Sequence, residues 1–239
     1  WLETEFPDRQ AVDIALPTAD QFPVASRDPT ERATELFQHV RTKCGLDDIG
    51  INLVAVEGQS GPPVPVSPAI ASQKWSGAAG TFQLDAEGTG GNMPTITYAA
   101  ESVDDPITLI ATFAHELAHL QLAFSPSCPP GGEDCEEEAT DFAAVWMGFG
   151  LFLSESAFVY SADNTQWGYR AQGYLNRMQL LTAMAIVAAR SGQSLEPVYA
   201  AMSKHLASDL RKIDKFVATR DLDAELNAID LFNFGVRRA

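Results

Sequence analysis

Cysteine is scarce in this chain, with Cys44, Cys128 and Cys135 the only 3 among 239 residues. Three cysteines are too few, and an odd number, for a fold held together by disulfides. The chain must therefore depend on a hydrophobic core. At this length a sizeable core can form within one large domain or two small ones. Cys128 and Cys135 flank the segment PPGGED, and the two thiols could either pair in an oxidising environment or stay free.

Long apolar runs are also absent. The two best candidates, FAAVWMGFGLFL at residues 142–153 and LLTAMAIVAA at residues 180–189, are shorter than the roughly 18 residues that a bilayer-spanning helix needs. They predict buried helices, and we expect no membrane span. The sequence does not define the compartment, and the cytoplasm is weakly favoured.

Positive charge is the third deficit. Lys and Arg number 16 against 32 Asp and Glu, which gives a formal net charge of −16. Such a balance repels phosphate backbones and anionic lipid surfaces, so we exclude nucleic acid as a main partner. The surplus of acid predicts a solvated acidic surface.

The distribution of apolar and helix-breaking residues predicts an α+β fold with a helical C-terminal half. Residues 1–29 are proline-rich and predict an extended arm, and residues 30–239 predict a single domain. We expect helices at residues 28–45, 107–124, 133–156 and 176–190, and helical segments between 195 and 229. We expect short strands at residues 51–58, 78–84 and 94–100, a loop at 59–68 and a turn at 85–93.

The segment ATFAHELAHLQL, residues 111–122, places two of the 4 histidines four residues apart. On a helix, His115 and His119 project from one face, which is the separation that two nitrogen ligands of one zinc ion need. Glu116 lies beside them and can reach a water molecule held at the same place. This His-Glu-x-x-His pattern is typical of zinc metallopeptidases, in which three protein ligands leave one position for water and a carboxylate accepts its proton. A glutamate buried between two buried histidines is costly without a partner such as a metal ion, which disfavours an accidental match.

A third ligand must come from elsewhere, because no further histidine follows His119 at the spacing that some other zinc peptidases use. The next predicted helix opens with EDCEEEATDF, in which Glu137 and Asp141 are four residues apart and share a face. Glu137 would complete the ligand set, and Asp141 would orient a ligand histidine. Glu136 and Glu138 remain rival ligands, although neither has an aspartate one turn later.

Together these residues resemble the gluzincin metallopeptidases. The pair of motifs His115-Glu-Leu-Ala-His119 and Glu137-x-x-x-Asp141 looks like the signature of the thermolysin-like group, and particularly of its minimal single-domain members. The stretches EEATDFAAVWMGFGLF and GYLNRMQLLTAMAIVAARSG also resemble a set of bacterial proteins that are largely uncharacterised. The resemblance covers residues 79–153, with weaker similarity up to residue 192.

The resemblance implies a zincin-like domain. In such a domain an N-terminal helix and a small mixed sheet pack on the His-Glu-x-x-His helix, and the glutamate helix and further helices follow. The resemblance implies that Zn²⁺ is bound by His115, His119 and Glu137. It implies that Glu116 is the general base and that Asp141 is the partner of a ligand histidine. It also implies that residues 94–100 form an edge strand near the cleft, where an extended peptide can pair by strand addition.

The expected function is zinc-dependent hydrolysis of a peptide bond in a peptide or protein substrate. The alternative is a catalytically inactive zincin-fold module that binds a metal ion or a partner. An intact Glu116 favours the enzyme, whereas the lack of a motif for the residue that stabilises the oxyanion favours the module. Candidates for that residue are Tyr160, Tyr169, Arg170, Tyr174 and His205.

Overall fold

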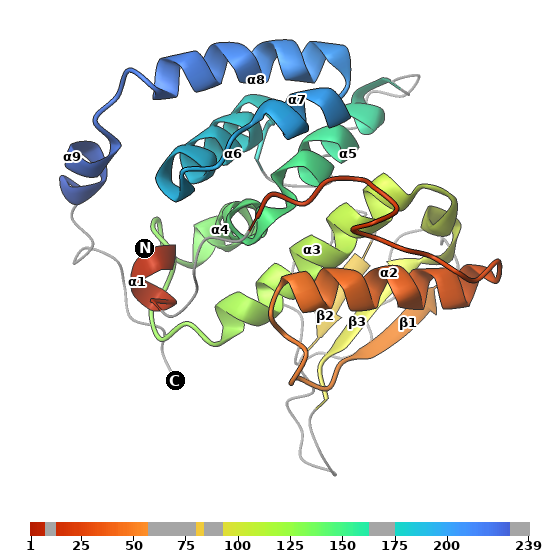
Figure 1. Ribbon diagram of the computed structural model, residues 1–239. Coiled ribbons are helices and arrows are strands. Elements are labelled where there is room, and N and C mark those ends of the chain that lie inside the picture. Colours follow the sequence, from red (N-terminus) through yellow and green to blue (C-terminus); the bar gives the residue numbers. More distant parts are fainter. Residues whose placement is uncertain (8–12, 57–79, 84–92, 163–174, 230–239) are drawn as a thin grey trace.

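The computed structural model describes residues 1–7, 13–56, 80–83, 93–162 and 175–229. A small sheet with two helices across it forms one part of the molecule, and a group of C-terminal helices forms the other (Figure 1). The mixture of helices with a small sheet that the sequence predicts is confirmed. The predicted loop at residues 59–68 and almost all of the predicted turn at 85–93 lie outside the described residues.

The sheet has three strands: β1 (Asn52–Val56), β2 (Gly80–Gln83) and β3 (Thr95–Ala99). Their order is β1-β3-β2, with β1 parallel and β2 antiparallel to β3. The sheet is therefore mixed, as expected, but the expectation of an edge strand at residues 94–100 is wrong because β3 is the central strand. The alternation of its residues, with Ile96 and Tyr98 buried, marks a buried face but does not define the neighbours that a strand acquires from distant parts of the chain.

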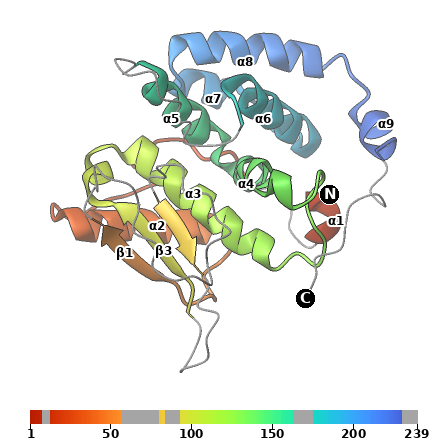
Figure 2. The same ribbon diagram turned by 180° about the vertical axis from the view of Figure 1, so that it is seen from behind.

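Helices α2 (Pro29–Lys43) and α3 (Pro106–Ala123) pack against each other beside the sheet (Figure 2). Both begin within one residue of the predicted starts, and in each an aspartate caps the first turn and a proline follows it. The ring of Phe113 on α3 makes edge-to-face contacts with Phe37 of α2 at 5.2 Å and with Tyr98 of β3 at 5.6 Å. These aromatic contacts tie α3 to both neighbours.

A short 3-10 segment, η2 (Ala100–Asp104), connects the sheet to α3, and a second one, η3 (Glu133–Cys135), precedes the next helices. The single helix expected at residues 133–156 is wrong. The chain instead forms α4 (Glu136–Ala144), a π-type turn η4 (Val145–Phe149) and α5 (Gly150–Ala162). Gly148 breaks the helix with φ 97° and ψ 3°, a conformation that glycine adopts readily because it has no Cβ. The carbonyl freed there accepts the backbone N–H of Ala15 at 2.9 Å.

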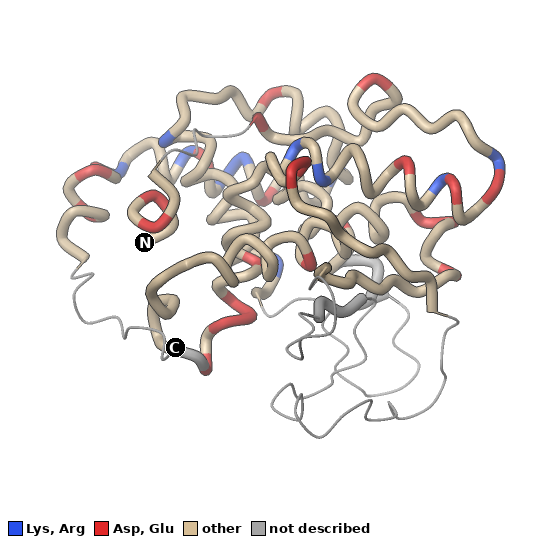
Figure 3. Tube along the Cα trace, turned by 90° about the horizontal axis from the view of Figure 1, so that it is seen from below, with Lys and Arg blue, Asp and Glu red and all other residues tan. Residues whose placement is uncertain are grey.

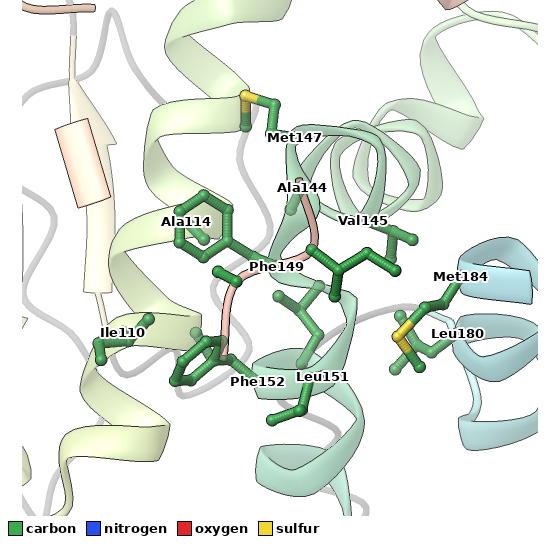
Figure 4. Close-up of a cluster of buried hydrophobic side chains, with 14 of the residues drawn as sticks. Ile110, Ala114, Ala144, Val145, Met147, Phe149, Leu151, Phe152, Leu180 and Met184 are labelled. Carbon is green, nitrogen blue, oxygen red and sulfur yellow. The ribbon is translucent and has the colours of Figure 1, made fainter. Parts of the chain in front are cut away.

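The C-terminal helices are α6 (Arg177–Ser191), α7 (Glu196–Ala201), α8 (Lys204–Val217) and α9 (Leu222–Asn227). Helix α6 opens with a capping box between Asn176 and Gln179 and ends at Gly192, whose φ is 65°. Figure 4 shows how the helical part joins the rest: Phe149 and Phe152 point toward Ile110 and Ala114 of α3, and Met184 approaches from α6. These side chains are buried and form one continuous core.

The N-terminal arm, residues 1–28, begins with the one-turn helix α1 (Leu2–Glu5). Residues 13–28, the other described part of the arm, have no regular secondary structure, and Ile14, Ala15 and Phe22 are buried. The carboxylate of Glu5 accepts hydrogen bonds at 2.6 Å from two serine hydroxyls in the connection between α3 and α4, those of Ser125 and Ser127. The arm is therefore part of the packed structure.

Acidic residues are spread over many elements and are not gathered on one (Figure 3). Among the described residues, no helix has both the length and the hydrophobicity that a membrane span requires. Cys128 and Cys135 are not joined by a disulfide, so that alternative is not realised in the structure.

Candidate metal centre

The two histidines of α3 face the start of α4. The ring centroids of His115 and His119 lie 4.8 Å apart with the planes at 84°, and their Nε2 atoms are separated by 3.2 Å. The sequence motif brings them together in the way that helical periodicity requires for residues i and i+4.

Glu137 on α4 joins this pair. Its Oε2 atom lies 3.4 Å from Nε2 of His115 and 3.3 Å from Nε2 of His119. Within the described chain, these three residues form the group that could hold a metal ion. Of the three successive glutamates at the start of α4, Glu137 is the one in that group.

The spacing of the three ligand atoms matches a small metal ion. Ligand atoms at about 2.0–2.1 Å from a tetrahedral zinc ion lie about 3.3 Å from one another. The three separations here, 3.2, 3.3 and 3.4 Å, are those of one face of such a tetrahedron. The residues present therefore fit a metal ion with three protein ligands.

The connection between α3 and α4 makes this meeting possible by reversing the chain. Gly131 has φ 93°, and a Cβ at this position would lie 2.5 Å from Sγ of Cys135. Only glycine can therefore make this turn without a shift of the neighbouring residues. Glu137 then falls in the first turn of α4, where the positive end of the helix dipole favours a carboxylate.

Asp141 lies one helical turn after Glu137 and is 1% exposed. One of its carboxylate oxygens accepts Nδ1–H of His115 at 2.9 Å, and the other accepts the backbone N–H of Leu175 at 2.9 Å. A neutral histidine that donates Nδ1–H presents the lone pair of Nε2 on its other side. Asp141 thereby aims His115 at the position where the three ligand atoms meet.

The charges of this group perturb one another. Burial lowers the pKa of His115, but its hydrogen bonds with Asp141 and Glu137 outweigh burial and raise that pKa to about 10. Burial raises the pKa of Glu137, but its hydrogen bonds with His115 and His119 lower it to about 2. Without a metal ion, the proton of an imidazolium thus supplies the positive charge that Glu137 requires.

Glu116 is buried beside the ligands, with 5% of its surface exposed. Burial raises its pKa, the two histidines lower it, and the charge of Glu137 raises it again, with a net shift upward. A carboxyl group with a raised pKa is a stronger base than an ordinary glutamate. The position and the pKa of Glu116 suit a proton carrier.

The three side chains of this group are partly exposed to solvent. The side chains of His115, His119 and Glu137 are 19%, 12% and 30% exposed, respectively. Structural metal sites are closed by four protein ligands, whereas catalytic sites keep one position open. Three candidate ligands with partly exposed side chains are compatible with a metal ion that keeps one position open.

The other candidate residues lie elsewhere or outside the description. Glu136 and Glu138 are partly exposed on α4, and His205 is exposed on α8, a helix that packs on α6 and α7. Tyr160 belongs to α5, but its side chain is outside the description. Tyr169, Arg170 and Tyr174 lie outside the described residues.

Sequence reasoning missed two contributors to the site. One is the backbone N–H of Leu175, which carries no sequence signal because any residue other than proline supplies it. The other is Thr140, whose Oγ1 lies 3.3 Å from Nδ1 of His119. The sequence does carry a signal for Thr140, because it lies one turn after Glu136, and a partner of a ligand histidine is expected one turn after a ligand glutamate.

The fold and the site therefore define a protein of mixed helices and a small sheet, with a His-His-Glu group compatible with a metal ion on two neighbouring helices. Comparisons of the chain with protein-family models, with curated proteins and with solved structures give no significant match.

Proposed function

We propose that the protein is a zinc-dependent peptidase of the gluzincin type. The observation that carries the proposal is the accessible group of His115, His119 and Glu137, with ligand atoms 3.2–3.4 Å apart and the carboxyl group of Glu116 buried beside it. Two imidazoles and one carboxylate with an open position form the ligand set of zinc peptidases.

The donor atoms favour zinc over other common ions. Magnesium and calcium prefer six or more oxygen ligands, whereas two of the three donors here are imidazole nitrogens. Copper(I) and iron–sulfur clusters prefer sulfur ligands, and no cysteine belongs to the group. Zinc combines a preference for imidazole with a tolerance for carboxylate at the separations found here.

A bound zinc ion would act as a Lewis acid toward a peptide carbonyl and would lower the pKa of water. The chain's own contribution to the chemistry centres on Glu116. In the proposed reaction Glu116 accepts one proton from the attacking water molecule and delivers it to the leaving amine nitrogen as the C–N bond breaks. Its raised pKa supports both halves of this transfer, since the group must take up a proton and give it back.

The position of β2 supports a peptide as the substrate. It is an outer strand of the described sheet and packs beside α3, the helix that carries both histidines. An outer strand can bind an extended chain through backbone hydrogen bonds, which recognise a peptide irrespective of its side chains. We therefore assign to β2 the substrate-pairing role that the sequence assigned to residues 94–100.

The decisive experiment compares wild type with Glu116→Gln in a peptide-library cleavage assay, with zinc content measured in parallel. The variant should keep zinc and the fold but lose nearly all cleavage, because glutamine preserves size and hydrogen bonding while it removes the base. Glu138→Gln is the matched control: it alters an acid on α4 outside the ligand group and should leave both zinc and cleavage intact.

The alternative outcomes are distinct. A wild type that binds zinc but shows no chelator-sensitive cleavage would be the metal-binding module that the sequence left open. Cleavage that survives both Glu116→Gln and chelation would contradict the proposal, since another site or another protein would then be responsible.

A further inference from the structure

We propose that Thr140 is a positioning residue for His119: its hydroxyl oxygen fixes the tautomer of this histidine so that the lone pair of Nε2 faces His115 and Glu137. The inference rests on the metal-binding part of the proposed function and is independent of whether a peptide is cleaved.

Thr140 is buried in the interface between α3 and α4, with 0% of its surface exposed. Its Oγ1 lies 2.8 Å from the carbonyl oxygen of Glu136, one turn earlier on α4. The same Oγ1 lies 3.3 Å from Nδ1 of His119 on α3. The hydroxyl thus touches its own helix and the ligand-bearing helix at once.

The number of protons decides the direction of both hydrogen bonds. A threonine hydroxyl has one hydrogen and two lone pairs. The carbonyl of Glu136 can only accept, so the hydroxyl hydrogen is used there, in the shorter of the two contacts. What faces His119 is therefore a lone pair of Oγ1, and Nδ1 must carry the hydrogen that completes the second bond.

This direction matters for the metal site. A neutral imidazole has one N–H and one lone pair, so a hydrogen on Nδ1 leaves Nε2 of His119 as an acceptor. That Nε2 atom lies 3.2 Å from Nε2 of His115 and 3.3 Å from Oε2 of Glu137. With the opposite tautomer, His119 would point an N–H at this position and could not be a ligand.

Each histidine of α3 thus donates a hydrogen bond to one of two successive residues of α4. His115 donates to Asp141, and His119 donates to Thr140. The two acceptors differ in charge. A neutral hydroxyl at residue 140 orients His119 without adding a carboxylate to a group that already contains Glu116, Glu137 and Asp141. A buried threonine that only bonds to the carbonyl four residues back would have no such role, and the experiment separates the two cases.

The test measures zinc affinity by chelator competition in wild type, Thr140→Val and Thr140→Ser. Valine keeps the shape but offers no lone pair, and the affinity should fall about 10- to 100-fold, the usual effect of removing the partner of a ligand histidine. Serine restores the hydroxyl and should restore nearly all of the affinity. Ser154→Ala is the matched control, because Ser154 is fully buried and its hydroxyl donates to a carbonyl four residues back; its zinc affinity should stay at the wild-type value.

Equal zinc affinity in Thr140→Val and wild type would overturn the inference. Should the valine variant fail to fold, nitrogen NMR of histidine-labelled wild type decides the question. Nδ1 of His119 should resonate as a protonated nitrogen, and Nε2 as a nitrogen with a free or metal-bound lone pair; the reverse assignment would overturn the inference. In the metal-free protein Oγ1 of Thr140 still faces Nδ1 of His119, so Nδ1 should resonate as a protonated nitrogen there too. A wild type without zinc affinity would therefore refute the proposed function while the proton on Nδ1 of His119 is still tested.

Discussion

Helix α3 makes two unlike contacts within one turn of each other. Ile110 and Ala114 contact Phe149 and Phe152, which follow the helix break at Gly148 (Figure 4). This contact is apolar and buried. His115 and His119 meet Glu137 on α4, and this contact is polar and partly open to solvent.

The two contacts are stabilised by different terms. The apolar contact needs only complementary shape, because removal of carbon surface from water is favourable by itself. The polar contact brings together the carboxylates of Glu116, Glu137 and Asp141, a formal charge of −3 when they are ionised and both imidazoles are neutral. Burial of such charge is unfavourable without a counter-charge. Protons or a metal ion must therefore supply the counter-charge. We expect the polar contact to depend on pH and on zinc, and the apolar contact to depend on neither.

The largest expected effect is on the polar side. Purified wild-type protein should contain about one zinc ion per chain, and His115→Ala should lose nearly all of it, because two ligands seldom hold zinc in competition with a chelator. The measurement is elemental analysis after purification with zinc present. His205→Ala, which changes an exposed histidine on α8, should retain the metal. A zinc-free wild type would refute the metal assignment.

On the apolar side, Phe152→Ala should destabilise the fold by about 3–5 kcal/mol, the usual cost of deleting a buried aromatic ring. Phe152 is fully buried, and its ring packs on Phe22 of the N-terminal arm at 5.3 Å. Denaturant unfolding should give the same loss with zinc and with chelator. If the alanine variant does not fold, Phe152→Leu should cost about 1 kcal/mol. A loss that vanishes when zinc is added would contradict the separation of the two contacts.

Removal of a partner of a ligand histidine should have a smaller effect. Asp141→Asn replaces one of two acceptor oxygens by an amide NH₂, so that either His115 or the backbone N–H of Leu175 loses its acceptor. Zinc affinity should fall about 10- to 100-fold while the stoichiometry remains unchanged. Asp134→Asn, at an exposed position just before α4, is the control. Wild-type affinity in Asp141→Asn would show that Asp141 does not orient a ligand.

The apolar contact illustrates what the sequence could and could not predict about the fold. The helix starts at Asp28 and Asn176 were predictable because capping is a local interaction. The break at Gly148 was not, because a glycine inside an apolar run has no local need to leave the helix. The reason lies far away in the sequence, where Ala15 donates to the carbonyl that the break exposes. Strand order failed for the same reason, since β1 and β2 come to flank β3 only through pairing of distant segments.

The polar contact was more predictable, because a metal-binding motif of this kind depends on the spacing of residues along one helix. His115 and His119 follow from the helical period, and Glu137 with Asp141 repeats the same logic on α4. The hydroxyl of Thr140 and the backbone of Leu175 did not follow, since each is defined by how α4 and the start of α6 pack against the histidines.

The smallest effect we expect is the response of the polar contact to a change of one pH unit. In the metal-free protein the pKa of His115 is raised from 6.5 to about 10, as its hydrogen bonds with Asp141 and Glu137 outweigh burial. Its charge therefore stabilises the fold fully below pH 6.5, and this contribution is lost as the pH rises toward 10. The pKa of Glu137 is lowered from 4.5 to about 2, so its contribution is present above pH 4.5 and is lost as the pH falls toward 2.

Zinc should reverse the trend above pH 6.5, because the metal can bind His115 only after the imidazolium proton leaves. Chelator competition between pH 7 and 8 should show zinc affinity rising about tenfold per pH unit, or about 1.4 kcal/mol, for the one proton displaced from His115. Thermal unfolding of the metal-free protein over the same range should instead show a falling melting temperature. Phe152→Leu is the control, because the apolar contact contains no titrating group: it should lower the melting temperature at every pH without changing either slope. A zinc affinity that does not vary with pH would mean that His115 is already neutral in the metal-free protein, and the polar contact would then lack the proton that we assign to it.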